Sequence, residues 1–97
     1  MAEVLDAAAV RGALDGLDHW SGDPAAISRT IELPSFLDAI TAVDRVAVLA
    51  EELGHHPDID IRFRTVTFRC YTHSAGGVTE RDVELARRID EILRSPA

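Results

Sequence analysis

A long segment between Ser35 and Leu53 carries apolar residues at helical spacing and stops abruptly. Ser35, with Asp38 three residues later, matches the capping box that begins many helices. The apolar residues that follow recur every three or four positions, which is typical of a helix with one buried face. Gly54 stands where a glycine commonly ends a helix, and Pro57 prevents easy continuation. The chain must therefore supply a second layer against which this helix buries its apolar face.

The segment after this helix changes to the periodicity of strands. Apolar residues alternate with polar ones through DIDIRFRTVTFRC (58–70), but the second half is out of phase with the first. A two-residue turn at Arg64-Thr65 restores the phase, because the residues that flank such a turn pair and point to the same face. The alternation therefore predicts a β-hairpin with His56 before its first strand and His73 at the end of its second. Both histidines are then expected at the same end of the hairpin.

Helical spacing and alternation also assign the other segments. They predict an α+β fold: a small antiparallel four-stranded sheet with three helices packed on one face, in the order α-β-β-α-β-β-α. At 97 residues the chain is expected to form one domain over 1–97. The remaining segments are a helix over 3–17, a short strand around His19–Ser21, a turn around Gly22-Asp23-Pro24, a strand over 26–33, and a third helix beginning with a Thr79–Asp82 capping box.

The composition excludes several classes of function. The net charge of −7 repels phosphate backbones and anionic membranes, so we expect neither nucleic-acid nor membrane binding. All ten basic residues are arginine, a habit typical of a GC-rich bacterium. Cys70 is the only cysteine, which excludes an internal disulfide and a Cys-rich zinc site and suits a reducing compartment. The sequence shows neither a leader pattern nor a long apolar run, so a cytoplasmic protein is expected.

Histidine is the side chain best suited to chemistry at neutral pH, because its charge changes there. His55 and His56 follow a helix C-terminus, which favours a positively charged imidazolium, and Glu51 lies one turn earlier, where it can orient His55. A simple C-terminal capping role is an alternative for this pair. A metal site is a second alternative, although adjacent residues in an extended chain project to opposite sides and no HExxH spacing occurs. No nucleophile elbow or phosphate loop is present.

The run AEELGHHPDIDIRFRTVTFRCYTHSAGGVTERD, from Ala50 to Asp82, closely resembles the pterin-4a-carbinolamine dehydratase family. The shared pattern is a glutamate, then HHP, a hairpin that ends in TH, a glycine turn, and a Thr or Ser three residues before an Asp. The resemblance extends back to Trp20 and covers most of the chain. It implies a hydro-lyase that removes water from a 4a-hydroxytetrahydropterin, giving a quinonoid dihydropterin in the recycling of tetrahydropterin. The pterin is then the substrate, and neither a cofactor nor a metal is implied.

The resemblance also implies roles for individual residues. An acid must protonate the departing hydroxyl at C4a, and a base must remove the N5 proton. His55, His56 and His73 match the catalytic histidines of the family, with His56 and His73 expected to face the reacting centre. Glu51 and Asp82 match its acidic positions and are expected to orient the imidazoles. The predicted substrate-binding residues are Trp20 (for which core packing is the alternative), Gly54, Pro57, Thr72 and Ser74.

Three positions depart from the family pattern: Tyr71 replaces a frequent Ser, Gly54 a frequent Asp or Asn, and Ile59 an aromatic residue of animal members. These changes bear on substrate preference more than on the reaction, because all three histidines remain. The family also suggests an alternative function as a protein-interaction module, since some members act as a dimerisation cofactor of a homeodomain transcription factor or as assembly chaperones. A homodimer or homotetramer is expected, with a link to an aromatic amino acid hydroxylase pathway.

Overall fold

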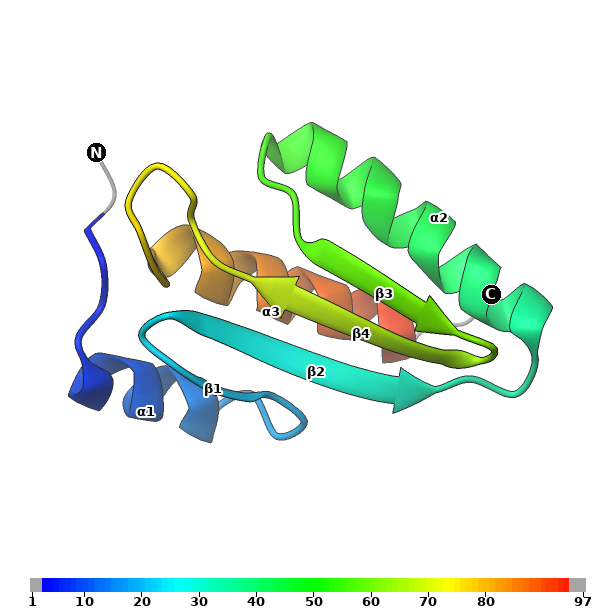
Figure 1. Cartoon of the computed structure of the whole chain (residues 1–97), viewed down its shortest axis with the longest axis horizontal. Helices are drawn as coiled ribbons and strands as arrows, with labels where there is room; N and C mark the ends of the chain where they lie inside the picture. Colours follow the sequence, from blue (N-terminus) through cyan, green and yellow to red (C-terminus); the bar gives the residue numbers. More distant parts are fainter. Residues whose placement is uncertain (1–2, 95–97) are drawn as a thin grey trace.

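The computed structural model describes residues 3–94 and shows one antiparallel sheet with the three helices on one side of it (Figure 1). The strands lie in the order β1-β2-β4-β3. The predicted α+β fold and its element order are therefore confirmed, while residues 1–2 and 95–97 of the predicted domain lie outside the described part. The elements are α1 (Ala7–Asp15), β1 (Ser21–Asp23), β2 (Ala26–Glu32), α2 (Phe36–Leu53), β3 (Asp58–Arg62), β4 (Thr65–Cys70) and α3 (Glu80–Arg94).

Both predicted helix caps form, and the one at α3 is a complete, reciprocal capping box. The Ser35 hydroxyl accepts a hydrogen bond from the backbone N–H of Asp38 at the start of α2. At the other end, Gly54 adopts a left-handed conformation (φ 62°) and its N–H caps the last turn. At the start of α3, the Asp82 carboxylate accepts from the backbone N–H of Thr79, and the Thr79 hydroxyl accepts from that of Arg81. Local sequence thus determines where α2 and α3 begin.

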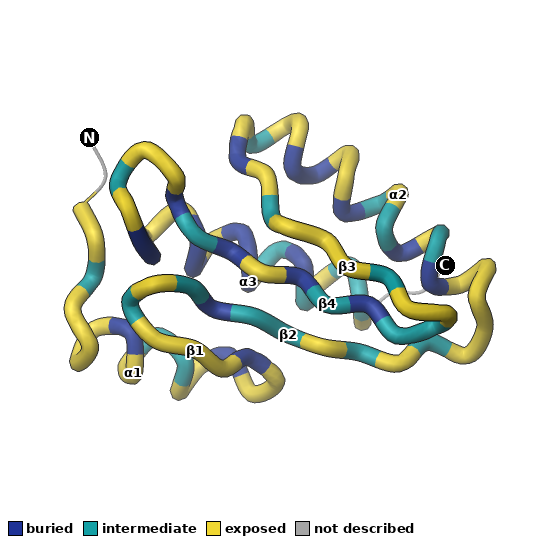
Figure 2. The backbone as a smooth tube through the Cα atoms, viewed as in Figure 1, coloured by how far each residue is buried: buried dark blue, intermediate teal, exposed yellow. Residues whose placement is uncertain are grey.

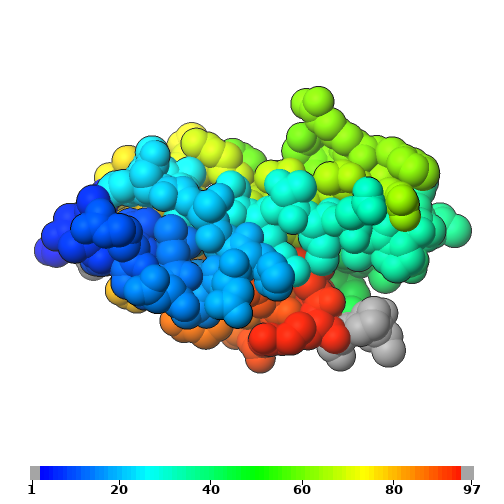
Figure 3. Space-filling view, turned by 90° about the horizontal axis from the view of Figure 1, so that it is seen from below, coloured from blue at the N-terminus to red at the C-terminus, as the bar shows by residue number. Residues whose placement is uncertain are grey.

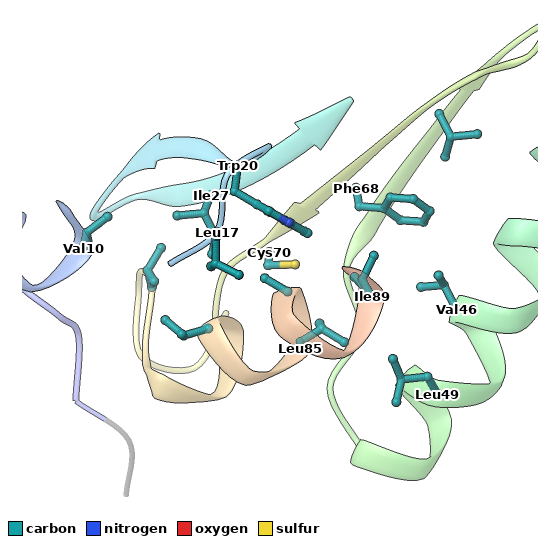
Figure 4. Close-up of a cluster of buried hydrophobic side chains, with 14 of the residues drawn as sticks. Val10, Leu17, Trp20, Ile27, Val46, Leu49, Phe68, Cys70, Leu85 and Ile89 are labelled. Carbon is teal, nitrogen blue, oxygen red and sulfur yellow. The ribbon is translucent and has the colours of Figure 1, made fainter. Parts of the chain in front are cut away.

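The core lies between the inner face of the sheet and the helices (Figure 4). Val66, Phe68 and Cys70 alternate along the central strand β4, and all three are fully shielded from solvent. Leu85 and Ile89 of α3 pack in the same cluster. Figure 2 shows this alternation of buried positions on β4, whereas β3, at the edge of the sheet, is mostly exposed.

The hairpin turns earlier than predicted. Arg62 pairs with Thr65, so the two-residue turn is Phe63-Arg64 and not Arg64-Thr65. Phe63 takes up the left-handed conformation that the turn requires (φ 55°), and its side chain is 72% exposed instead of continuing the inner row of β3. Ile61 opposite Val66 and Ile59 opposite Phe68 then form the inner row. The prediction failed because a phenylalanine at positive φ gives no recognisable turn signal.

The N-terminal part also differs in its boundaries. α1 is shorter than the predicted helix over 3–17, because Asp6 caps it at its start and it ends before Gly16. The first strand is Ser21–Asp23, not His19–Ser21, and the turn after it is Pro24-Ala25, one residue later than the predicted turn. The Asp23 carboxylate stabilises this turn by accepting from the backbone N–H of Ala25. A side chain at Gly22 would clash with β2, because a Cβ there would lie 2.2 Å from the Ala26 carbonyl oxygen.

The outer face of the sheet is polar, as expected from the arginines of the hairpin. Arg62 contacts Asp60, and Arg69 contacts Asp58 on the neighbouring strand at 3.5 Å. Such exposed pairs contribute little to stability. In Figure 3 the strands form the upper part of the molecule and α3 the lower part. Within the part of the chain that the structure describes, no helix combines the length and apolar character needed to cross a membrane.

The buried thiol of Cys70 is expected to make stability depend on pH. Burial raises the pKa of Cys70 far above its ordinary value, and the Asp82 and Asp58 carboxylates add to the shift. Because the unfolded thiol ionises near pH ~8.5, the unfolded state binds fewer protons above that pH. Stability should therefore fall by about 2 kcal/mol between pH 8.5 and 10. Urea unfolding at several pH values measures this loss. If the Cys70→Ala variant loses the same stability over this pH range, the loss comes from other titrating groups.

Candidate active site

The three predicted histidines meet around one open hollow of about 270 Å³. His55 and His56 come from the connection between α2 and β3, and His73 comes from the loop between β4 and α3. Figure 1 shows both segments at the same end of the sheet. Antiparallel pairing of β3 and β4 brings them together, because the start of one strand lies beside the end of the other. The hollow is lined by Gly54, His55, His56, Tyr71, Thr72, His73, Ser74 and Arg81.

The left-handed turn at Gly54 sets the directions of the two adjacent histidines. The backbone N–H of His55 still bonds to the Ala50 carbonyl at the end of α2. Beyond this point the chain runs through a short connection to β3, and the two histidines differ in their exposure. His55 turns inward and is buried, whereas His56 turns outward and is exposed. One short connection therefore supplies two imidazoles in different environments.

His55 is held by a fully buried carboxylate. Its Nε2 lies 2.5 Å from Oδ1 of Asp82, whose side chain has no exposed surface. The other oxygen, Oδ2, accepts from the Thr72 hydroxyl at 2.7 Å and from the backbone N–H of Thr79 at 2.9 Å. Asp82 also lies in the first turn of α3, where the helix dipole favours negative charge. The predicted orienting role of Asp82 therefore has a structural basis in contacts with three different groups.

His56 is held by a carboxylate at the surface. Its Nε2 lies 2.5 Å from Oε2 of Glu51, with the two side chains 61% and 76% exposed. The sequence suggested that Glu51 orients His55, and the structure corrects this. The left-handed Gly54 directs His55 into the core and returns the following residue over the last turn of α2.

His73 lies in a tight loop closed by backbone hydrogen bonds. The N–H of Thr72 bonds to the Gly77 carbonyl, and the N–H of Gly76 bonds to the Thr72 carbonyl. Gly76 takes a positive φ of 83° that the turn requires. The imidazole is exposed, and its Nε2 lies 2.8 Å from the Tyr71 hydroxyl. The histidine that comes from the second loop therefore has a neutral partner instead of a carboxylate.

The arrangement can exchange protons at three imidazoles around one cavity. The Nε2 atoms of the three histidines each face a different partner: Asp82, Glu51 and Tyr71. Among residues 3–94, no group of three or more His, Cys, Asp or Glu side chains is placed to hold a metal ion. Each imidazole therefore has one ring nitrogen fixed by a hydrogen bond.

Comparison with known proteins identifies the family. A model of the family described as pterin 4 alpha carbinolamine dehydratase matches residues 3–92. A relative from Nocardia farcinica is 55% identical over 92 residues, covering 95% of this chain and 97% of its own. One from Mycolicibacterium smegmatis is 53% identical and covers 93% and 96%. Both are named "Putative pterin-4-alpha-carbinolamine dehydratase".

The chain belongs to the pterin 4 alpha carbinolamine dehydratase family. The resemblance found in the sequence, and with it the assignment to a family of hydro-lyases, is confirmed. Among solved structures, a transcriptional coactivator/pterin dehydratase from Brucella melitensis superposes with a TM-score of 0.86 at 33% identity, covering 91% of this chain and 96% of that one. A pterin dehydratase-like RuBisCO assembly factor of the alpha-carboxysome shares the fold, with a TM-score of 0.62 at 24% identity over 75% of this chain and 84% of its own.

Two residues predicted to bind substrate lie elsewhere in this dehydratase-family chain. Trp20 is buried in the core, where its indole N–H donates to Asp90 Oδ1 at 2.8 Å. Asp90 also pairs with Arg29, so the indole helps to join the sheet to α3. This corrects the predicted pocket position and agrees with the alternative of core packing. Pro57 is half-buried and also lies outside the residues that line the hollow, unlike Gly54, Thr72 and Ser74.

Sequence reasoning missed two residues of the hollow. Arg81 donates through Nη2 to the Gly54 carbonyl at 2.9 Å, and so connects the start of α3 to the segment that carries His55 and His56. No signal in the sequence indicates this contact, because adjacent residues of a helix project in different directions. Tyr71 had been noted only as a departure from the family pattern. It directly follows β4, and its hydroxyl meets His73 at the start of the next loop.

Proposed function

We propose that this chain catalyses the loss of water from a 4a-hydroxytetrahydropterin, giving a quinonoid dihydropterin, by acid–base catalysis at its histidines. The reaction belongs to tetrahydropterin recycling. The single observation that carries the proposal is that His55, His56 and His73 converge on one hollow, although they come from two separate loops. Family membership supplies the substrate class, and the residue contacts supply the chemistry.

The reaction requires two proton transfers. The C4a–O bond breaks and the hydroxyl leaves as water, so an acid must protonate it. The N5–H bond breaks and its electron pair forms the C4a=N5 double bond, so a base must take that proton. Positioned groups of this kind typically contribute about 10²- to 10⁴-fold each. Imidazoles suit both roles, because each can give or accept a proton near neutral pH.

The carboxylates support these roles by orientation. A carboxylate on Nε2 accepts the N–H of the imidazole in both its neutral and its charged form. Asp82 and Glu51 therefore leave Nδ1 of His55 and His56 as the nitrogen that changes its proton. The two carboxylates keep the imidazole rings in place while Nδ1 gives or accepts the proton.

The rest of the proposal concerns the setting of the reaction. The pterin is the substrate, no further cofactor takes part, and a hydroxylase of aromatic amino acids supplies the carbinolamine in the cytoplasm. The chain is expected to assemble as a homodimer or homotetramer, which sedimentation equilibrium measures against its mass of 10.6 kDa. The role as an interaction module remains an alternative prediction, and retention of all three histidines favours the enzyme.

The test is a stopped-flow assay of carbinolamine dehydration with the wild type, His56→Ala and His73→Ala. Each substitution removes an exposed imidazole from the hollow, and we expect at least a tenfold loss of rate, at about the lower end of acid–base contributions. His19→Ala is the matched control, because His19 is exposed and lies outside the hollow. Equal rates in all four proteins would rule out the proposed mechanism, and a wild type no faster than buffer would rule out the activity.

A further inference from the structure

Tyr71 lies against His73 at the edge of the hollow. Its hydroxyl is 2.8 Å from Nε2 of His73, and the two ring centroids are 4.8 Å apart. The tyrosine follows directly after β4 and is half-buried, so the strand determines its position. It is the only tyrosine of the chain.

Arg69 also contacts the Tyr71 ring. Its guanidinium carbon lies 4.8 Å from the ring centroid, within the range of a cation–π contact. Arg69 itself contacts Asp58, its partner across the hairpin, at 3.5 Å. The ring therefore contacts both a cation on β4 and the imidazole of the next loop.

The chemistry of the hydroxyl distinguishes His73 from the other two histidines. Carboxylates can only accept from His55 and His56, whereas a phenol can both donate and accept. When the Tyr71 O–H donates to Nε2 of neutral His73, the imidazole N–H must lie on Nδ1. Toward protonated His73 the Nε2–H donates to the phenol oxygen. One contact therefore persists in both protonation states of His73.

We propose that Tyr71 is a positioning residue that sets the ring orientation and the neutral tautomer of His73, with the proton on Nδ1. The neutral imidazoles in the hollow then differ: His55 and His56 carry their N–H on Nε2, toward the carboxylates, and His73 carries it on Nδ1. The kinetic part of this inference rests on the proposed function, whereas the tautomer of His73 is a property of the free protein.

The test substitutes Tyr71→Phe, which removes the hydroxyl and keeps the ring that contacts Arg69 and His73. In the wild type at a pH where His73 is neutral, ¹⁵N NMR of the imidazoles should show the Nδ1–H tautomer for His73 and the Nε2–H tautomer for His55 and His56. In Tyr71→Phe the His73 signals should move toward the Nε2–H form. We expect kcat for dehydration to fall about 3- to 10-fold, as for one lost hydrogen bond, with KM within about twofold.

Thr67→Val is the matched control, because it removes a hydroxyl from the same strand, where Thr67 bonds to Thr30 away from the hollow. It should leave the tautomers and kcat unchanged. An unchanged His73 tautomer in Tyr71→Phe overturns the inference, whatever happens to kcat, and so does a changed tautomer with wild-type kcat in an active enzyme. If the wild type does not dehydrate carbinolamine, a tautomer shift still supports the positioning role, while the proposed function fails.

Discussion

Asp82→Ala is expected to destabilise the protein by about 3–5 kcal/mol, the cost of removing one partner from a buried charged pair. The substitution leaves His55 Nε2 and the Thr79 N–H without this acceptor, and the Thr72 hydroxyl keeps only the Thr79 hydroxyl as a partner. An unsatisfied buried donor costs about 1–3 kcal/mol. The Asp82→Ala substitution also removes the carboxylate of the α3 capping box. In a domain of this size, the midpoint of thermal unfolding should fall by at least about 12 °C.

Urea unfolding followed by the fluorescence of the buried Trp20 measures this loss. Asp60→Ala is the matched control: it removes an aspartate whose side chain is 56% exposed and pairs with Arg62 on the outer face of the hairpin. A change within about 0.5 kcal/mol is expected there. If the two alanine variants unfold at the same urea concentration, the Asp82 network does not stabilise the fold as argued.

His55→Gln is expected to lower the rate of dehydration by about 100-fold or more with little loss of stability. A glutamine amide can still donate to the Asp82 carboxylate, so the buried network keeps its donor, but an amide cannot accept or release a proton near neutral pH. His55 is also the most firmly held of the three imidazoles, since burial and Asp82 fix its ring. Oriented groups contribute most to a rate, because no freedom of motion is lost when the reaction occurs.

Stopped-flow kinetics and urea unfolding of the same preparation separate the two effects. His19→Gln makes the same chemical change at an exposed histidine outside the hollow, and it should keep the wild-type rate. If His55→Gln keeps more than about one third of the wild-type rate, His55 serves only to fill the core beside Asp82. A large loss of stability instead would mean that the amide does not replace the imidazole in the network. Asp82→Asn would then show whether the lost rate comes from the disturbed network or from the missing proton-transfer group.

The parts of the fold that follow from local chemistry were predictable. Helix ends are marked by Ser35, Gly54 and Thr79, whose own groups cap the neighbouring backbone. Capping of this kind depends on residue type, which the sequence gives directly. The hairpin turn was not predictable, since Phe63 is held at positive φ by the pairing of the strands on either side. Gly22 is a similar case. Glycine suggests a turn, but Gly22 lies in β1, where the close approach of the Ala26 carbonyl leaves no room for a side chain.

The sequence by itself determined the alternation of helices and strands, the identity of the three histidines and the family to which the chain belongs. These depend on residue type and spacing, which are local. Only the tertiary structure decided which partner each imidazole meets: Asp82 for His55, Glu51 for His56 and Tyr71 for His73. Such pairing depends on the direction of each side chain. The left-handed conformation of Gly54 is enough to decide that His55 points inward and His56 outward.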